Sequence, residues 1–181
     1  MHEQSPSGAP PRALIIIAVL LGVALAASVA VLGLSRTDDA SAPAPVGPLP
    51  LVPVDAPESG SPECAALIDA LPDELPSRGD SLARRRLAEP APEASAAWGT
   101  SDPVVLRCGL GRPPELEADS RLQVINGVQW LTVAGQGVAT WFTVDRDVFV
   151  ALTITEASGT GPLQAVSDAV SSALRPVPPR S

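Results

Sequence analysis

Residues 122–154 read LQVINGVQWLTVAGQGVATWFTVDRDVFVALTI, and this stretch decides the fold. It contains four runs rich in Val, Ile, Thr and aromatic residues, and short turn-forming segments separate the runs. This pattern is typical of consecutive β-hairpins. The sequence therefore predicts an antiparallel meander sheet with strands at 122–125, 128–133, 138–144 and 148–154.

One face of this sheet is expected to be apolar and covered. Side chains alternate between the two faces of a strand, and this rule places nine apolar residues on the same face. They are Leu131, Val133, Val138, Phe142, Val144, Val148, Val150, Leu152 and Ile154. A helical stripe of apolar residues follows Gly161 and suits the covering role.

A second helix is expected before the sheet. Ser61 is a typical capping residue, Pro62 suits the first helical turn, and Pro72 would end the helix. Between this helix and the sheet, residues 104–108 predict a buried strand, whereas residues 84–86, three consecutive arginines, predict a solvated loop. The fold class is therefore α+β, a two-layer domain with an antiparallel meander sheet and two helices.

Three aromatic residues are expected on the other face of the sheet. A four-residue loop at 134–137 would set Trp130 directly opposite Trp141, with Phe149 diagonally beside Trp141. Aromatic surfaces of this kind can bind sugars or extended peptides, so these residues form the candidate binding face. In the alternative interpretation, the first helix or the segment 82–98 covers the rings as a second core.

The amino-terminal part of the chain predicts a membrane anchor. Residues 13–34 carry no charge and include thirteen Leu, Ile or Val residues, enough for one transmembrane helix. The expected organisation is a cytoplasmic tail at 1–12, this helix, a Pro/Ala-rich disordered linker at 35–60, a domain at 61–175 and a disordered tail at 176–181. The alternative is a cleaved signal peptide, because Ala24 and Ala26 fit a small-x-small cleavage site.

The two cysteines bear on the location of the domain. A bond between Cys64 and Cys108 would suit an oxidising compartment, whereas a redox pair or a metal site is the alternative. We expect a single-pass protein of the cell membrane, with a cytoplasmic amino terminus and an extracytoplasmic carboxy-terminal domain.

Composition narrows the chemistry. The net charge is −8, which disfavours nucleic-acid binding. The chain contains one histidine, His2, and neither Lys nor Tyr, so we assign no catalytic residue, metal ligand or cofactor. The alternative function is a carboxylate-dependent enzyme that acts on envelope glycans, with Asp145 and Asp147 as its acids.

Several longer stretches resemble the actinobacterial membrane-protein family called domain of unknown function 3515. They are CAAL at 64–67, PVVLRCG at 103–109, VINGVQW at 124–130, TWFTVDR at 140–146 and VFVAL at 148–152. The resemblance implies an actinobacterial source, membrane attachment and an envelope context, but it brings no established activity. We therefore expect a non-enzymatic binding or assembly module of the bacterial cell envelope, whose partner is an envelope protein or a cell-wall polymer.

Overall fold

The computed structural model describes residues 47–179 of the chain. The expected tail at 1–12, the membrane segment at 13–34 and the first part of the linker lie outside these residues. Within 47–179, no helix is both long and apolar enough to span a bilayer.

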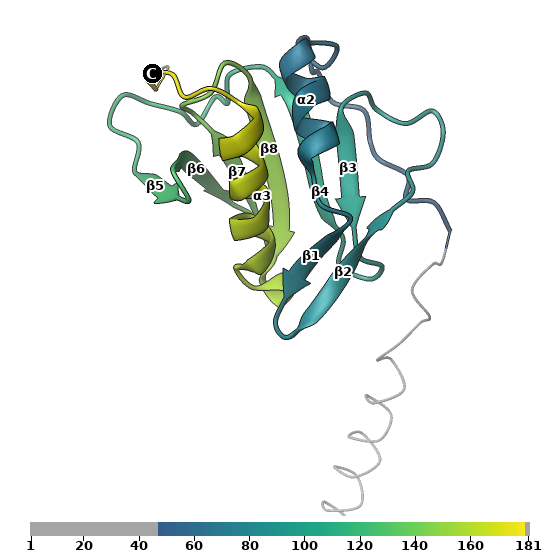
Figure 1. Cartoon of the computed structure of the whole chain (residues 1–181). Helices are drawn as coiled ribbons and strands as arrows, with labels where there is room; N and C mark the ends of the chain where they lie inside the picture. The colour runs from purple at the N-terminus through teal and green to yellow at the C-terminus, as the bar shows by residue number, and fades with distance from the viewer. Residues whose placement is uncertain (1–46, 180–181) are drawn as a thin grey trace, which may run out of the picture. The chain divides into compact units, whose positions relative to one another are not determined.

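Eight strands, two α-helices and one short 3-10 helix make up the described part of the chain (Figure 1). In chain order they are α2 (Pro62–Ala70), β1 (Glu74–Ser77), β2 (Asp80–Arg85), β3 (Ser95–Trp98), β4 (Val104–Leu110), β5 (Leu122–Ile125), β6 (Val128–Ala134), β7 (Val138–Thr143), β8 (Phe149–Thr155), η1 (Glu156–Ser158) and α3 (Gly161–Ala173). The predicted helices and the five predicted strands are present, with bounds that differ by a few residues.

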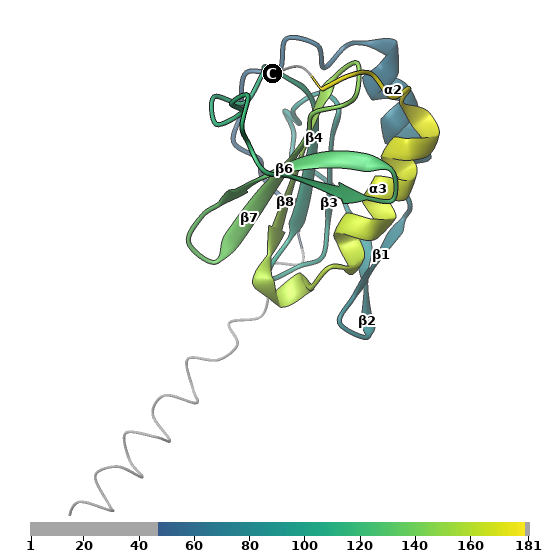
Figure 2. The same cartoon turned by 90° about the vertical axis from the view of Figure 1, so that its left-hand side faces the viewer.

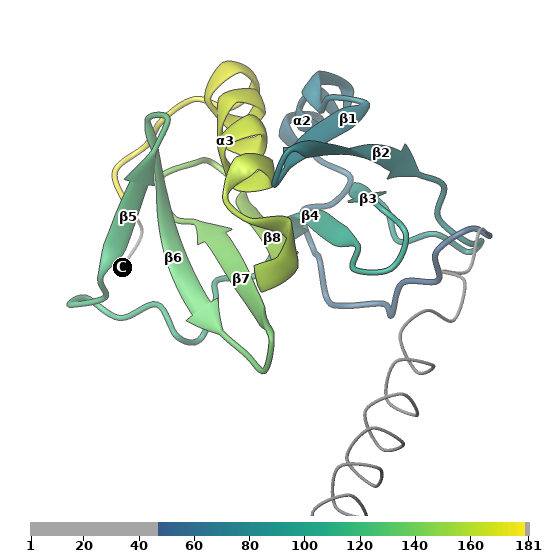
Figure 3. The ribbon, with the colours of Figure 1, turned by 90° about the horizontal axis from the view of Figure 1, so that it is seen from below.

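The strands form one antiparallel sheet in the order β1-β2-β3-β4-β8-β7-β6-β5. β5 to β8 form the expected meander. β1 to β4 form a second run of consecutive neighbours, and the pairing of β4 with β8 joins the two. The sheet is curled, and Figure 3 shows β5, β6 and β7 on one side of α3 and β1 and β2 on the other. α3 contacts both β1 and β5, the two end strands, so the helix fills the opening of the curl.

The main core lies between the helices and the face of the sheet that they cover, which we call the helix face. Figure 2 shows α2 and α3 side by side along this flank. Leu67 of α2, Leu106 of β4, Leu152 of β8 and Val166 of α3 are fully buried here. The α+β class expected from the sequence is therefore confirmed for the described residues.

The predicted disulfide is confirmed. Cys64 near the start of α2 is bonded to Cys108 of β4, with 5.6 Å between their Cα atoms, and both residues are fully buried. The helix begins as the sequence indicates, because the Ser61 side chain accepts a hydrogen bond from the Cys64 backbone N–H at 3.2 Å. The bond therefore fixes α2 on the centre of the sheet.

A smaller cluster lies on the opposite, outer face of the sheet. Its buried members are Leu116, Leu131, Val144 and Phe149. Leu116 belongs to the connection between β4 and β5, which covers this part of the sheet. The domain therefore has apolar packing on both faces of the sheet.

The loop expected at residues 84–86 is wrong, because Arg84 and Arg85 end strand β2. Alternation gives no signal here, since every residue of β2 is at least partly exposed. The guanidinium groups of these arginines make the contacts that hold this end of the strand. The Arg84 guanidinium lies 5.8 Å from the Trp98 ring, and Arg85 donates hydrogen bonds to the carbonyls of Gly47 and Thr100.

Residues 47–60 and 176–179, the described parts of the expected linker (35–60) and tail (176–181), make hydrogen bonds with the domain. Leu49 exchanges backbone hydrogen bonds with Arg86 and Ala88, and the Val52 carbonyl accepts one from Arg107. We call residues 47–60 the strap. At the other end, the Val177 N–H donates to the Asp145 carbonyl at 3.0 Å. The prolines do not prevent this packing, because the amides and carbonyls of the residues between them still pair with the domain.

Candidate functional site

The three aromatic residues of the predicted binding face do not share one surface. β6 and β7 pair two residues away from the expected register, so Trp130 faces Thr143 and Trp141 faces Thr132. The two tryptophans therefore remain on one face but are diagonal neighbours rather than directly opposite. The shift arises because β6 continues to Ala134, and the Gly135 N–H closes the turn on the Val138 carbonyl at 2.8 Å.

Trp130 belongs to the main core. Its side chain is 0% exposed, and its indole N–H donates to the Ser167 hydroxyl of α3 at 3.0 Å. Ser167 in turn donates to the Leu163 carbonyl, so the buried polar atoms are satisfied. Trp130 therefore holds α3 on the sheet and offers no surface to a ligand.

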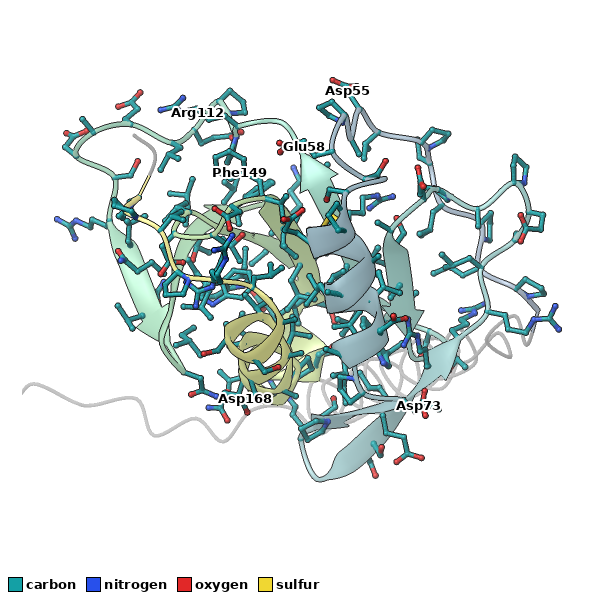
Figure 4. All side chains as sticks on the ribbon, turned by 45° about the horizontal axis from the view of Figure 1, so that its top comes forward. Asp55, Glu58, Asp73, Arg112, Phe149 and Asp168 are labelled. Carbon is teal, nitrogen blue, oxygen red and sulfur yellow. A yellow bond between two sulfur atoms is a disulfide. The ribbon has the colours of Figure 1, made fainter. Side chains whose placement is uncertain are left out.

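Phe149 lies on the outer face, opposite both tryptophans. β7 pairs with β8 one residue away from the expected register, since Trp141 faces Leu152. A one-residue slip moves every side chain of a strand to the other face. Figure 4 shows Phe149 below the loop that carries Arg112, far from Asp168 on α3. Phe149 is buried in the outer-face cluster.

The slip has a local cause in residues 144–148, which form an irregular connection rather than a tight turn. Asp145 and Arg146 are buried there, with 2.9 Å between the Asp145 carboxylate and Nη1 of Arg146. Arg146 also donates to the Gly127 carbonyl at 3.0 Å, which ties this connection to the β5–β6 turn. Buried charges need such partners, and the residues that provide the pairing lengthen the connection.

Trp141 remains as the candidate, because its half-buried ring lines an open groove of about 440 Å³. The groove lies between the β6–β7 turn, the end of β8, η1 and the start of α3. Apolar side chains form most of its lining: Ala134, Val138, Ala139, Trp141, Ile154 and Leu163. Val138 at its edge is 38% exposed. The groove thus presents an aromatic ring and aliphatic side chains to solvent.

Polar groups form the rim of this groove. Arg78, at the β1–β2 turn, donates a hydrogen bond to the Glu156 carbonyl of η1 at 2.6 Å. Its aliphatic part lies over Gly159, where an added Cβ would come within 3.1 Å of the Arg78 Cγ. The hydroxyls of Thr155 and Thr160 and the Glu156 side chain complete the rim. One positive and one negative side chain therefore flank an apolar centre.

A second cleft, of about 360 Å³, lies on the other side of η1 and is rich in hydroxyl groups. Ser77, Ser81, Thr100, Ser101 and Ser158 are among the residues that line it. The Ser77 hydroxyl donates to the Ser158 carbonyl at 3.1 Å, so the β1–β2 hairpin is attached to η1 between the two hollows. The two hollows therefore adjoin at one end of the sheet, the end seen in Figure 3.

The two acids of the alternative enzyme are not placed for catalysis together. The Asp145 carboxylate is buried against Arg146, whereas Asp147 lies 3.9 Å from Arg175 at the surface. Neither lines the groove or the hydroxyl-rich cleft. Among residues 47–179, no three His, Cys, Asp or Glu side chains group as metal ligands would.

Burial affects the pKa of Arg107, which lies away from the groove. Desolvation lowers the pKa of Arg107, whose guanidinium lies under the strap and donates to the Val52 carbonyl at 3.0 Å. Arg107 thus acts in holding the strap rather than in the groove.

The sequence pattern missed most of the groove. Arg78 and Glu156 lie in regions without hairpin or helix periodicity, and they meet only because β1 packs on α3 and η1. Of the residues that line the groove, the sequence singled out Trp141 alone, as a large aromatic residue in a predicted strand. The structure shows that this ring is only half-buried.

Comparisons with known proteins place the chain in one group. The model of a protein family described as "Protein of unknown function (DUF3515)" matches residues 19–179. No curated protein and no solved structure matches the chain.

Proposed function

Because the chain belongs to the DUF3515 family of proteins of unknown function, we propose its role from its own geometry: it is a non-enzymatic binding module of the bacterial cell envelope. The groove at Trp141 takes an apolar segment of a partner protein. The observation that carries the proposal is the apolar centre of this groove, ringed by Arg78 and Glu156.

The envelope location is supported by the disulfide and by the amino-terminal sequence. Structural disulfides persist in oxidising compartments and are rare in the cytosol. Residues 13–34 have the length and apolarity of a membrane anchor. We propose that this segment spans the cell membrane once, with the described domain outside.

The lining of the groove favours a protein partner over a wall polymer. Sugar sites need many hydrogen-bonding groups beside the aromatic ring, and here the polar groups are confined to the rim. Protein interfaces commonly have a desolvated aromatic or aliphatic centre and a polar rim. A partner segment with one or two apolar side chains and a polar edge fits this lining.

The place where the chain enters the domain suggests where the partner lies. Arg85 donates to the Gly47 carbonyl at 2.9 Å and to the Thr100 carbonyl at 2.8 Å. Thr100 lines the hydroxyl-rich cleft beside η1, so Gly47 is at the end of the sheet that carries the groove. This end is also where the described chain begins, after the segment proposed as the membrane anchor. We therefore propose that the partner is another protein at the membrane surface.

The test is site-specific photo-crosslinking of the full-length chain in its native cells. The probe replaces Thr160, an exposed residue of the groove, and the matched control probe replaces Val52, which is 76% exposed on the strap. We expect one protein adduct from the Thr160 probe and none from the Val52 probe. Val138→Glu should remove the adduct, because a carboxylate would replace an apolar side chain at the edge of the groove while the core stays intact.

Trp141→Ala should weaken the same adduct, since truncating a central interface tryptophan costs roughly 2 kcal/mol or more, about a thirtyfold loss of affinity. A thermal unfolding midpoint close to that of the wild-type chain in each variant reports that the domain has folded. Persistence of the adduct in Val138→Glu would contradict the proposal. Val138-dependent co-sedimentation of the purified chain with isolated cell-wall polymer would instead identify a glycan as the ligand.

A further inference from the structure

The two ends of the curled sheet differ in how well they are closed. At one end, Pro76 within β1 lacks an N–H that an added strand could use. Helix α3 also packs directly against this strand, because a Cβ on Gly161 would lie 2.3 Å from the Pro76 carbonyl oxygen. The β1 edge is therefore covered.

The β5 edge at the other end is open. Within residues 47–179, β6 is the one strand that pairs with β5. The Val144 N–H donates to the Gln129 carbonyl, so the backbone of Gln129 points toward β7. Val124 lies opposite Gln129, and its own N–H and C=O must therefore point away from β6.

The side chains of β5 add to this exposure. Val124 is 70% exposed, and the strand contains no proline and no charged residue. Proteins usually protect an edge strand with such residues, with a bulge or with a covering segment. An open edge with an exposed valine is the kind of surface that pairs with another strand.

The charges beside the edge indicate which strand fits. Arg121 precedes β5, and at the other end Asn126 donates to the Asp168 carboxylate of α3 at 2.8 Å. Figure 4 shows Asp168 on α3. Ile125 packs on the helix face, so Arg121, four residues earlier in an alternating strand, projects toward the same face.

We propose that the β5 edge binds the β5 edge of a second copy of this chain, in antiparallel register about a two-fold axis at Gln123. This register pairs Leu122 of one copy with Val124 of the other through their outward backbone groups. Arg121 of each copy then lies opposite Ile125 of the other, beside Asn126 and the Asp168 carboxylate. The two-fold axis repeats this charge pairing at both ends of the contact.

The pairing does not involve the groove, so a test of the dimer and a test of the proposed function can fail separately. The pairing joins two sheets into one and leaves both Trp141 grooves free. The contact is short, and we therefore expect a dimer that depends on concentration rather than a permanent one.

A cysteine at the axis tests the register. In the full-length chain, Gln123→Cys places two thiols directly opposite each other, at a spacing that suits a disulfide. Val52→Cys is the matched control, since Val52 is also exposed but lies on the strap. Under mild oxidation, we expect a covalent dimer of Gln123→Cys on non-reducing gels, and at least roughly tenfold less from Val52→Cys.

Two further changes made in the Gln123→Cys chain test the backbone pairing and the charges. Val124→Pro removes an outward N–H and should abolish the dimer. Arg121→Asp should reduce it by roughly tenfold, and adding Asp168→Arg should restore it. Retention of the Cys64–Cys108 bond and of the thermal midpoint shows that the variants are folded.

Three results would overturn the proposal: equal dimer yields from the two cysteine positions, a dimer that survives Val124→Pro, or a charge reversal that does not restore it. An adduct between Gln123→Cys and a different protein, without self-adduct, would show that the edge binds another chain and would also refute the second-copy assignment.

Discussion

Among the glycines of residues 47–179, Gly109 is the one where an added Cβ would come closest to another atom. Its φ is +84°, and a Cβ there would lie 2.2 Å from the backbone N of Ser59. The strap crosses β4 at this point, where the Glu58 N–H donates to the Gly109 carbonyl at 3.0 Å. Only glycine allows both the backbone conformation and this approach.

We expect Gly109→Ala to lower the free energy of unfolding by about 2 to 4 kcal/mol, because it combines positive-φ strain with displacement of the strap. Urea unfolding followed by tryptophan fluorescence measures the change. Gly111→Ala is the matched control two residues away. It has open space around its Cβ position, and the expected change is within about 0.5 kcal/mol. Equal effects at the two glycines would mean that the strap does not dock at β4.

At the scale of elements, the sequence pattern predicted β5 to β8 because each contains β-branched residues and lies between turn-forming segments. It failed for β1, which has four residues and one buried apolar side chain, Leu75, and for β2, which packs through Arg84 and Arg85 rather than through an apolar face. The face of the sheet on which each side chain lies was harder to predict than the presence of the hairpins. Predicting this face requires the exact length of each connection, and the buried pair Asp145 and Arg146 sets that length between β7 and β8.

Errors in the predicted register explain why the three aromatic residues of the predicted binding face do not lie together. The register between β6 and β7 was wrong by an even number of residues, so Trp130 and Trp141 stayed on one face. The register between β7 and β8 was wrong by one, so Phe149 moved to the other. Which face the helices cover could not be predicted from alternation alone, since both faces of the sheet carry apolar residues.

The carboxy-terminal segment after α3 acts as an element of the fold although it has no regular structure. The Val177 N–H donates to the Asp145 carbonyl beside the buried ion pair. Val177→Pro removes this donor, and we expect a loss of about 1 kcal/mol in the free energy of unfolding. Val177→Ala keeps the N–H and controls for the lost side chain. The two variants are compared by thermal denaturation, and a loss no larger in the proline variant would contradict the role of this hydrogen bond.

At the scale of the whole molecule, the disulfide connects the amino-terminal elements to the meander. Cys64 and Cys108 are 44 residues apart in sequence, and the loop between them contains β1, β2 and β3. β1 and β2 are the most polar strands of the sheet, and β2 has no buried residue, whereas Ala96, Ala97 and Trp98 of β3 are buried. The covalent bond thus encloses the two most polar strands of the sheet.

Replacing both cysteines, Cys64→Ala with Cys108→Ala, should therefore destabilise the domain strongly. In the chain-entropy account, a disulfide that closes a loop of this length raises the free energy of unfolding by about 4 kcal/mol, because it lowers the conformational entropy of the unfolded chain. The free energy of unfolding from urea titration, with the wild-type chain under non-reducing conditions as reference, measures the loss. Because both sulfurs are fully buried, reductant alone should leave the folded wild-type chain unchanged and act only as urea unfolds it. A loss below about 1 kcal/mol would mean that the polar strands are held by their own contacts, above all those of Arg84 and Arg85, and that the bond adds little to them.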